Sequence, residues 1–144
     1  EGNELVLGGV KIPYIKGLVG YSDADVLLHA VSDSILGAAS LGDIGTQFPN
    51  DDPAYKGASS MGLLKKVNEL INGNGYRVNN LDLVLIAEEP KISPFIANMK
   101  RNISSILGLE ESGVGIKATT NEGVGPIGRL EAIASYAVVT LKEE

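Results

Sequence analysis

A dense aliphatic run from Leu81 to Ala87 decides how the middle of the chain can fold. Pro90 follows too closely for this run to be a helix, so the sequence predicts a buried strand. Two later segments also predict strands: Val114 to Thr120, and Ile133 to Leu141, which is rich in β-branched residues. Because these strands alternate with helical segments, the order favours one mixed sheet backed by helices.

Capping and turn residues place the remaining elements. We expect a hairpin over Leu5–Pro13 with a Gly-Gly bend. The first helix should run from Asp23 to about Leu41, with Ser22 or Asp23 as its cap. A second helix should follow Ser59 or Ser60 and stop around Gly73, and a third should begin at Ser93-Pro94 and end at Gly108. No repeat or linker divides the sequence, so we expect a single domain over residues 1–144.

Composition excludes several function classes. The chain has no cysteine, which excludes disulfides, a thiolate nucleophile and a cysteine-based zinc site. Its formal net charge of −6 argues against a broad surface for nucleic acid or anionic membranes. No apolar run approaches the roughly 20 residues that span a bilayer, and no signal peptide is visible. The lack of cysteine fits a reducing compartment, so we expect a cytoplasmic location, or the plastid stroma in a plant or alga.

The only histidine, His29, lies at helical spacing between Asp25 and Asp33. The three residues form a polar stripe on an otherwise apolar helix. Two interpretations remain open: His29 could hydrogen-bond to a neighbouring Asp and stabilise the helix, or it could ligate a metal with its ring oriented by a carboxylate. A catalytic zinc needs about three protein ligands, which these residues alone do not establish.

Several polar loops carry groups that suit a nucleotide or a diphosphate. Asp43-Ile44-Gly45 could hold a ribose diol, and Lys91, after the aliphatic run, could neutralise a phosphate. Lys117–Gly125 offers threonine hydroxyls for phosphate oxygens, with Glu122 for Mg²⁺. Gly125–Glu131 adds an arginine. Each loop alone is also explained as an ordinary turn or connection, whereas together they indicate a metal-assisted nucleotide or diphosphate site.

The order of these motifs carries a resemblance to one family. The matching stretches are Gly8–Pro13, Ser22–Val26 with His29 and Asp33, Leu41–Gly45, Phe48-Pro49, Asp52-Pro53, Tyr55–Ala58, Pro90-Lys91, Lys117–Thr120, Glu122, and Gly128-Arg129 with Glu131. In this order they resemble the 2-C-methyl-D-erythritol 2,4-cyclodiphosphate synthase family of the non-mevalonate isoprenoid pathway. The resemblance runs from the first hairpin to the last strand.

The resemblance implies a fold and a reaction. The fold is an α+β domain with a mixed four-stranded sheet backed by helices on one face, assembled as a homotrimer with active sites between subunits. The enzyme would be a phosphorus–oxygen lyase that releases CMP. In its reaction, the 2-phosphate of 4-diphosphocytidyl-2-C-methyl-D-erythritol 2-phosphate attacks the β-phosphorus and closes a cyclic diphosphate. The protein mainly positions the two ends and neutralises charge.

The resemblance also implies residue roles in this sequence. His29 would ligate Zn²⁺, supported by Asp33, and Glu122 would hold Mg²⁺ or Mn²⁺. The expected catalytic residues are Thr120, Tyr21 and Asp25. The expected substrate-binding residues are Ser22, Asp43, Ile44, Gly45, Phe48, Asp52, Ala87, Pro90, Lys91, Ile92, Ser93, Thr119, Thr120, Pro126 and Arg129. Of these, Asp43 would bind ribose, and Arg129 would line a central cavity that accepts isoprenoid diphosphates.

Two departures from the family pattern bear on activity. The family begins with a strand that carries an Asp-x-His pair of zinc ligands. This sequence starts just after the position of that strand, so we expect that the strand with the other two zinc ligands has been lost from its N-terminus. Tyr21 stands where the family usually has a histidine; a tyrosine can donate a hydrogen bond to phosphate but is not a cation near neutral pH. These departures keep an alternative open: a catalytically silent relative that binds a cytidine nucleotide or an isoprenoid diphosphate.

Overall fold

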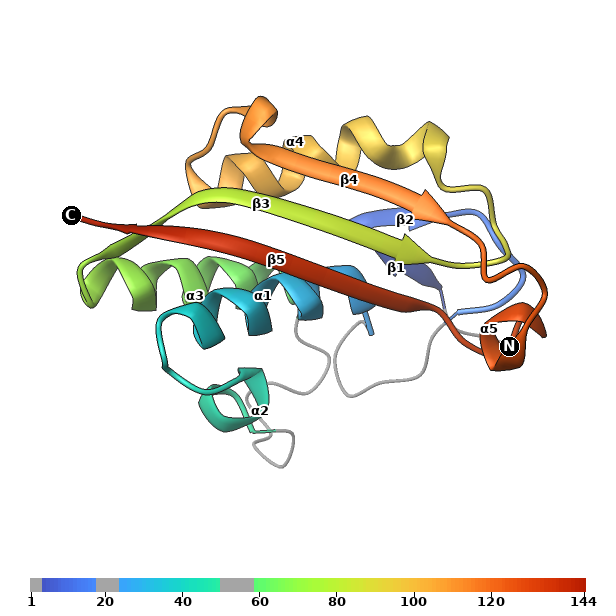
Figure 1. Ribbon diagram of the computed structural model, residues 1–144, viewed down its shortest axis with the longest axis horizontal. Coiled ribbons are helices and arrows are strands. Elements are labelled where there is room, and N and C mark those ends of the chain that lie inside the picture. The colour runs from blue at the N-terminus through green and yellow to red at the C-terminus, as the bar shows by residue number, and fades with distance from the viewer. Residues whose placement is uncertain (1–3, 18–23, 50–58) are drawn as a thin grey trace.

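The protein is described here by a computed structural model, which defines residues 4–17, 24–49 and 59–144. The α-helices and strands are labelled in Figure 1. The elements in chain order are β1 (Leu5–Leu7), β2 (Val10–Ile12), α1 (Val26–Ala38), α2 (Ile44–Gln47), α3 (Ser60–Gly73), β3 (Tyr76–Ile86), the 3-10 helix η2 (Ser93–Phe95), α4 (Ile96–Leu107), the 3-10 helix η3 (Glu111–Gly113), β4 (Val114–Thr119), α5 (Gly125–Gly128) and β5 (Ala134–Glu143). No helix within these ranges has the length and apolar character needed to cross a membrane.

The main sheet has the strand order β4-β3-β5 and is mixed, as the sequence predicts. β3 is parallel to β4 and antiparallel to β5, so that Leu83 lies between Ile116 and Ala137. Among the described residues this sheet has three strands rather than the expected four, because β1 and β2 form a separate two-stranded sheet. That hairpin is tied to a helix instead: the Asn102 side-chain amide of α4 donates to the Gly8 carbonyl at 3.0 Å.

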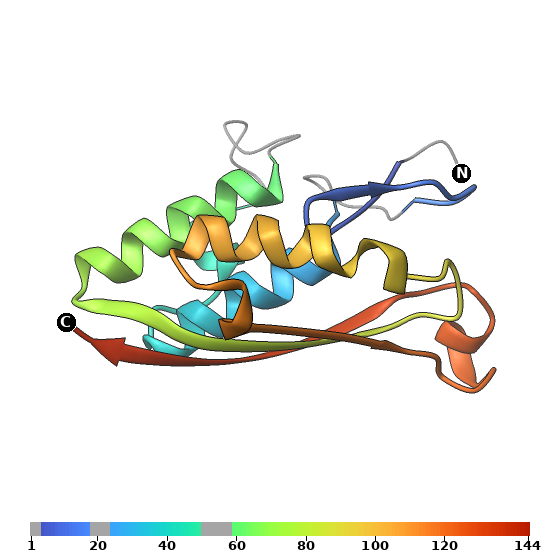
Figure 2. The ribbon, with the colours of Figure 1, turned by 90° about the horizontal axis from the view of Figure 1, so that it is seen from above.

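The three long helices, α1, α3 and α4, cover one face of the main sheet, as expected (Figure 2). On the sheet side of this layer, Leu81, Leu83 and Leu85 of β3 are at most 1% exposed. The helices contribute fully buried side chains, including Leu28, Ile35, Leu64, Ile71, Met99 and Ile103. Removal of this aliphatic layer from water is the main force that holds helices and sheet together.

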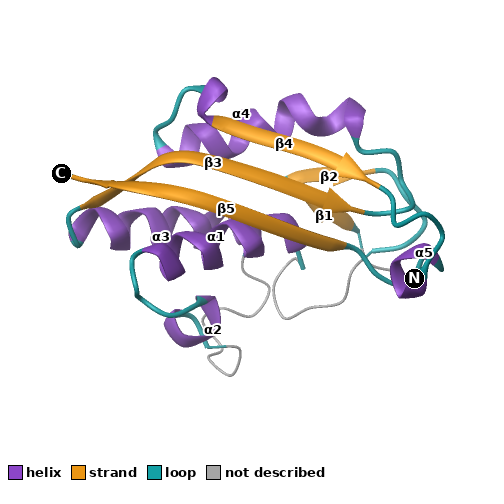
Figure 3. Ribbon diagram, in the orientation of Figure 1, coloured by secondary structure: helices purple, strands orange, loops and turns teal. Residues whose placement is uncertain are grey.

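The opposite face of the sheet has no helix over it in the part of the chain that the structure describes (Figure 3). Side chains alternate along a strand, so the cross-strand pair Val84 and Tyr136 points to this side. Tyr136 and Val138 are 63% and 68% exposed. A single layer of helices therefore leaves this sheet face open, with Tyr136 and Val138 next to the exposed ion pair of Asp82 and Lys117.

Several element ends differ from the sequence prediction. α1 is capped by Asp25 rather than by Ser22 or Asp23 and ends at Ala38 rather than about Leu41. Ser93-Pro94 lie in the short η2, so α4 begins only at Ile96. α1 begins at Val26, later than expected, because the Asp25 carboxylate accepts the Leu28 N–H and caps the helix. β3 begins at Tyr76, ahead of the aliphatic run, because its polar first half pairs with the end of β5. α4 ends as predicted at Gly108, which takes the left-handed conformation with φ 69°.

Candidate active site

The candidate site lies where the parallel strands β3 and β4 end, because their carboxyl ends meet at one edge of the sheet. Ile86 pairs with Thr119, and the Ala87 N–H donates to the Thr119 carbonyl at 3.0 Å. The segments that follow the two strands border an open cavity of about 670 Å³. Its lining includes the predicted substrate-binding residues Ala87, Pro90, Lys91, Ile92, Ser93, Thr119 and Thr120.

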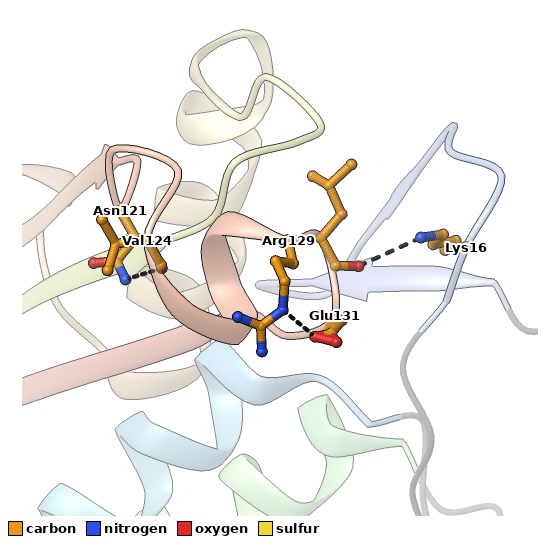
Figure 4. Close-up of polar contacts among 6 residues, drawn as sticks. Lys16, Asn121, Val124, Arg129 and Glu131 are labelled. Atoms are coloured by element: carbon orange, nitrogen blue, oxygen red, sulfur yellow. Dashed lines mark hydrogen bonds and ion pairs between the residues drawn. The ribbon is translucent and has the colours of Figure 1, made fainter.

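A tight turn after β4 carries Thr120 and Glu122. Glu122 and Gly123 both have left-handed backbone, with φ of 55° and 73°. The Glu122 N–H donates to Thr120 Oγ1 at 3.3 Å, and the Asn121 side-chain amide donates to the Val124 carbonyl at 2.8 Å (Figure 4). Glu122 is exposed, so its carboxylate is accessible to a cation that also binds phosphate oxygens.

Two consecutive glutamates after β3 have different partners. Glu88 Oε2 accepts the Asn121 N–H at 2.5 Å, and Glu88 Oε1 accepts the Gly123 N–H at 3.1 Å. Glu89 instead accepts the Tyr14 hydroxyl at 2.7 Å. That hydrogen bond, together with burial and the charge of Glu89, raises the pKa of Tyr14 above its ordinary value. Glu88 therefore contacts the turn after β4, whereas Glu89 contacts the segment after β2.

His29 lies on α1 with its Nε2 at 2.9 Å from the hydroxyl of Ser60, the first residue of α3. The carboxylates of the predicted stripe bind backbone groups. Asp25 accepts the N–H groups of the turn between β1 and β2, and Asp33 accepts the Ile44 N–H at 2.8 Å. Each residue of the stripe thus connects α1 to a different segment, and Ser60 is a partner of the histidine ring.

The two expected metals fit the described residues differently. These residues contain no group of three or more His, Asp or Glu side chains that could hold a metal ion. Zn²⁺ at His29 needs about two further protein ligands, so the described residues do not complete a zinc site. Mg²⁺ binds through one or two carboxylates together with substrate phosphates. The exposed Glu122 beside Thr120 fits that requirement.

Asp43 caps α2 at some distance along the chain from these loops. Its Oδ1 accepts both the N–H and the hydroxyl of Thr46, at 2.8 and 2.9 Å. These two hydrogen bonds lower the pKa of the Asp43 carboxyl, and the bond from the Thr46 N–H contributes more than the bond from the Thr46 hydroxyl. Asp43 is therefore an ionised acceptor near neutral pH, which suits a diol. The predicted Ile44 and Gly45 lie in α2, and Phe48 follows it directly.

The segment between β4 and β5 holds the predicted residues Pro126, in α5, and Arg129, directly after it. Arg129 Nε lies 3.0 Å from Glu131 Oε2, as Figure 4 shows. Lys16 Nζ donates to the Leu130 carbonyl at 3.4 Å and links this segment to the chain after β2. Arg129 is more than half exposed, so its charge is accessible to an anion.

Comparison with known proteins decides the family. The sequence pattern of the YgbB family matches residues 1–142. The chain belongs to the YgbB family. Two similar proteins bear the name 2-C-methyl-D-erythritol 2,4-cyclodiphosphate synthase. One, from Chlorobium luteolum, is 56% identical over 142 residues and covers 99% of this chain and 90% of that protein. The other, from Clostridium perfringens, is 53% identical over 141 residues, with 98% and 90% covered.

Solved structures share the fold of this YgbB family member. The bifunctional IspDF from Campylobacter jejuni superposes with a TM-score of 0.95 at 42% identity, over 100% of this chain and 39% of that longer chain. IspF from Plasmodium falciparum, in a CDP complex, superposes with a TM-score of 0.86 at 38% identity, over 100% of this chain and 86% of that one. The α+β fold predicted from the sequence is confirmed.

Two residues of this YgbB family site have little local sequence signal. Ser60 resembles one of two alternative helix caps, but Ser59 is the cap and accepts the Met61 N–H at 3.2 Å, while Ser60 contacts His29. Glu88 resembles an ordinary residue of a polar connection. Its position directly after a buried strand is the signal that could have indicated it, since polar groups at strand carboxyl ends commonly serve a site.

Three predicted residues, Tyr21, Ser22 and Asp52, lie outside the described residues, and their roles stay predictions. The catalytic role of Asp25 also stays a prediction. Its carboxylate is 0% exposed and accepts backbone N–H groups, an arrangement that supports a structural role.

Proposed function

We propose that this chain converts 4-diphosphocytidyl-2-C-methyl-D-erythritol 2-phosphate to the cyclic diphosphate and CMP. The observation that carries the proposal is the cavity at the ends of β3 and β4, which gathers Lys91, Thr119 and Thr120 next to the turn of Glu122. Relatives up to 56% identical over nearly the whole chain bear the name of this synthase, and a similar solved structure is a CDP complex. The chain would thus be a phosphorus–oxygen lyase of isoprenoid biosynthesis.

The reaction is an intramolecular displacement at phosphorus. An oxygen of the 2-phosphate bonds to the β-phosphorus while the bond from that phosphorus to the bridging oxygen breaks, and CMP leaves with the bridging oxygen. The atoms balance without water. The barrier falls mainly because the protein holds the two ends of one molecule in line and stabilises the charge on the phosphoryl oxygens.

Residues of the cavity have the chemistry for these tasks. The Thr120 oxygen accepts the Glu122 N–H, so its own proton is available for a phosphoryl oxygen. Lys91 supplies a positive charge near the diphosphate. Glu122 would hold Mg²⁺ or Mn²⁺, which when bound neutralises the diphosphate. The backbone of residues 87–93 would hold the cytosine, and Asp43 the ribose. Zn²⁺ on His29 is a separate proposal, and it would need further ligands from outside the described residues.

A homotrimer with sites between subunits is part of the proposal. Its support in this chain is the open sheet face on which Tyr136 and Val138 are exposed together, because neighbouring exposed apolar side chains commonly mark an interface. Arg129 would then line a central cavity that accepts an isoprenoid diphosphate. A cytoplasmic or plastid location stays a prediction.

The direct test is to incubate the protein with 4-diphosphocytidyl-2-C-methyl-D-erythritol 2-phosphate and Mg²⁺. We expect CMP by chromatography and the cyclic diphosphate by ³¹P NMR, in equal amounts. Lys91→Ala should lower kcat/KM because it removes the charge that faces the diphosphate. Absence of CMP with both Mg²⁺ and Zn²⁺ supplied would contradict the proposal.

A second function is a binding protein for cytidine nucleotides without turnover. The observation in its favour is that the described residues around His29 do not complete a zinc site. This function predicts that CDP raises the melting temperature, although the substrate is not converted. A protein whose melting temperature CDP does not change would have neither function.

A further inference from the structure

Glu88 joins the two segments that form the candidate site. It lies two residues after β3 and is half-buried. Its two carboxylate oxygens accept the N–H groups of Asn121 and Gly123, at 2.5 and 3.1 Å. The residue between these two donors is Glu122. One side chain at the end of β3 therefore holds the backbone on both sides of Glu122.

The turn at Glu122 benefits from such an outside partner. Glu122 and Gly123 have φ of 55° and 73°, a region that is sterically disfavoured for a residue with a Cβ, as Glu122 has. The hydrogen bond inside the turn, from the Glu122 N–H to Thr120, is long at 3.3 Å. Hydrogen bonds to a carboxylate are about twice as strong as neutral ones. The contacts from Glu88 are thus the stronger support for this backbone.

The other side of the turn packs against α5. A Cβ placed on Gly128 would lie 2.1 Å from the Gly123 carbonyl carbon, so the two backbones are in direct contact. Gly123 is therefore hydrogen-bonded to Glu88 on one side and packed against Gly128 on the other. Together these contacts hold the turn in one position relative to β3.

We propose that Glu88 is a positioning residue for the phosphoryl transfer. By fixing the turn from Asn121 to Gly123, its carboxylate places the Glu122 carboxylate and the Thr120 hydroxyl so that both can meet the substrate diphosphate. This rests on the proposed function. Glu88 also lines the cavity, and in this role it acts through the two backbone N–H groups that its carboxylate binds. Its loss should weaken the metal-dependent step more than the binding of the nucleoside by residues 87–93.

The test compares Glu88→Ala and Glu88→Gln with Glu110→Gln, an exposed carboxylate just before η3. For Glu88→Ala we expect kcat to fall and the half-saturating Mg²⁺ concentration to rise, each by about 10- to 100-fold. CDP affinity measured without metal should stay within about threefold. Amide exchange at Asn121 and Gly123 should accelerate by about tenfold or more. Glu88→Gln keeps one acceptor oxygen, so its kcat, its half-saturating Mg²⁺ concentration and its amide exchange rates should lie between those of Glu88→Ala and wild type. Glu110→Gln should match wild type.

The proposal is overturned by wild-type kcat and Mg²⁺ dependence in Glu88→Ala, or by unchanged exchange at both amides in Glu88→Ala and Glu88→Gln. Equal loss of CDP affinity and kcat would also overturn it, because the residue would then act on binding as a whole. If wild type itself releases no CMP, the proposed function fails, and the exchange measurement still decides whether Glu88 fixes the turn.

Discussion

At the scale of single residues, Asp25 connects the first hairpin to the first helix. Its carboxylate is 0% exposed and accepts the N–H groups of Gly8, Gly9 and Leu28 at 3.0, 2.8 and 3.0 Å. A buried carboxylate is stable only when donors of this kind replace its water. Both glycines have positive φ, 59° and 75°, which turns their N–H groups toward it.

Asp25→Asn should therefore destabilise the protein although it preserves the shape of the side chain. An amide offers one oxygen and places an NH₂ group against a remaining N–H, so we expect a loss of about 2–3 kcal/mol in the free energy of unfolding. Denaturant unfolding measures it. Asp33→Asn is the control, because one amide oxygen suffices for the single Ile44 N–H that Asp33 accepts. Equal stability of the two variants would show that Asp25 does not have this role.

The pKa of Asp43 makes stability depend on pH in a defined direction. Hydrogen bonds from Thr46 lower the pKa of Asp43 in the folded protein below its ordinary value of 3.8. The ionised carboxylate therefore stabilises the folded state above pH 3.8. This contribution is lost as the pH falls through the pKa of the folded state. Asp43→Asn keeps the cap but not the charge. The difference in melting temperature between wild type and the Asp43→Asn variant should become smaller as the pH falls from about 5 to about 2. A constant difference would contradict the lowered pKa.

His29 is the residue at which removal of a metal is tested. If it ligates Zn²⁺, His29→Ala should lower the zinc content of the purified protein to background, because the remaining ligands bind too weakly to retain the ion. Elemental analysis measures the content, and light scattering on the same sample checks that the variant is assembled as wild type. Zinc retained at the wild-type ratio would refute the role of His29.

At the scale of elements, local patterns predict much of the fold because period and turn residues are local signals. The aliphatic run predicts the buried half of β3, and Gly108 predicts the end of α4. The polar half from Tyr76 to Asn80 lacks that signal, since it is a strand only because β5 lies beside it. For the same reason, the contacts of Ser60 with His29 and of Glu88 with the turn after β4 could not be predicted: each joins segments that are distant in sequence.

The short helix α5 and the turn after β4 form one packed unit, which Gly128→Ala tests. The new methyl group would lie 2.1 Å from a backbone carbon of Gly123, so the turn must shift. We expect a cost of about 1–3 kcal/mol in stability and a clear fall in kcat. Gly37→Ala is the matched control: nothing lies within 4 Å of its Cβ position in α1, so this change should stabilise by about 0.5–1 kcal/mol. Activity retained in Gly128→Ala would show that the turn tolerates the shift.

At the scale of the whole molecule, the layers leave the sheet half covered, with helices on one side and Tyr136 and Val138 exposed on the other. The sequence predicts helices on one face, but it cannot show from local patterns which strand residues face outward. That assignment depends on the register of β3 with β5.

The open face predicts the effect of a charge on assembly. Val138→Lys places an ammonium group in the proposed interface, opposite Asp82, whose charge Lys117 already neutralises. Burial of the added charge against another subunit is unfavourable. We expect monomers by light scattering and, because the sites would lie between subunits, loss of CMP release. Ser105→Lys, on the exposed side of α4, is the control. Trimers in Val138→Lys, or monomers in wild type, would reject this face as the interface.

The parallel register of β3 and β4 also limits which changes in chain length this protein can accept. Ile86 lies opposite Thr119, and neighbouring side chains alternate between faces. Deletion of Glu111, before the start of β4, would slide the strand by one position and turn Lys117 toward the helices. It would also draw Asn121 away from Glu88. The length of a loop at one end of β4 is thus constrained by the phosphate chemistry proposed at the other end.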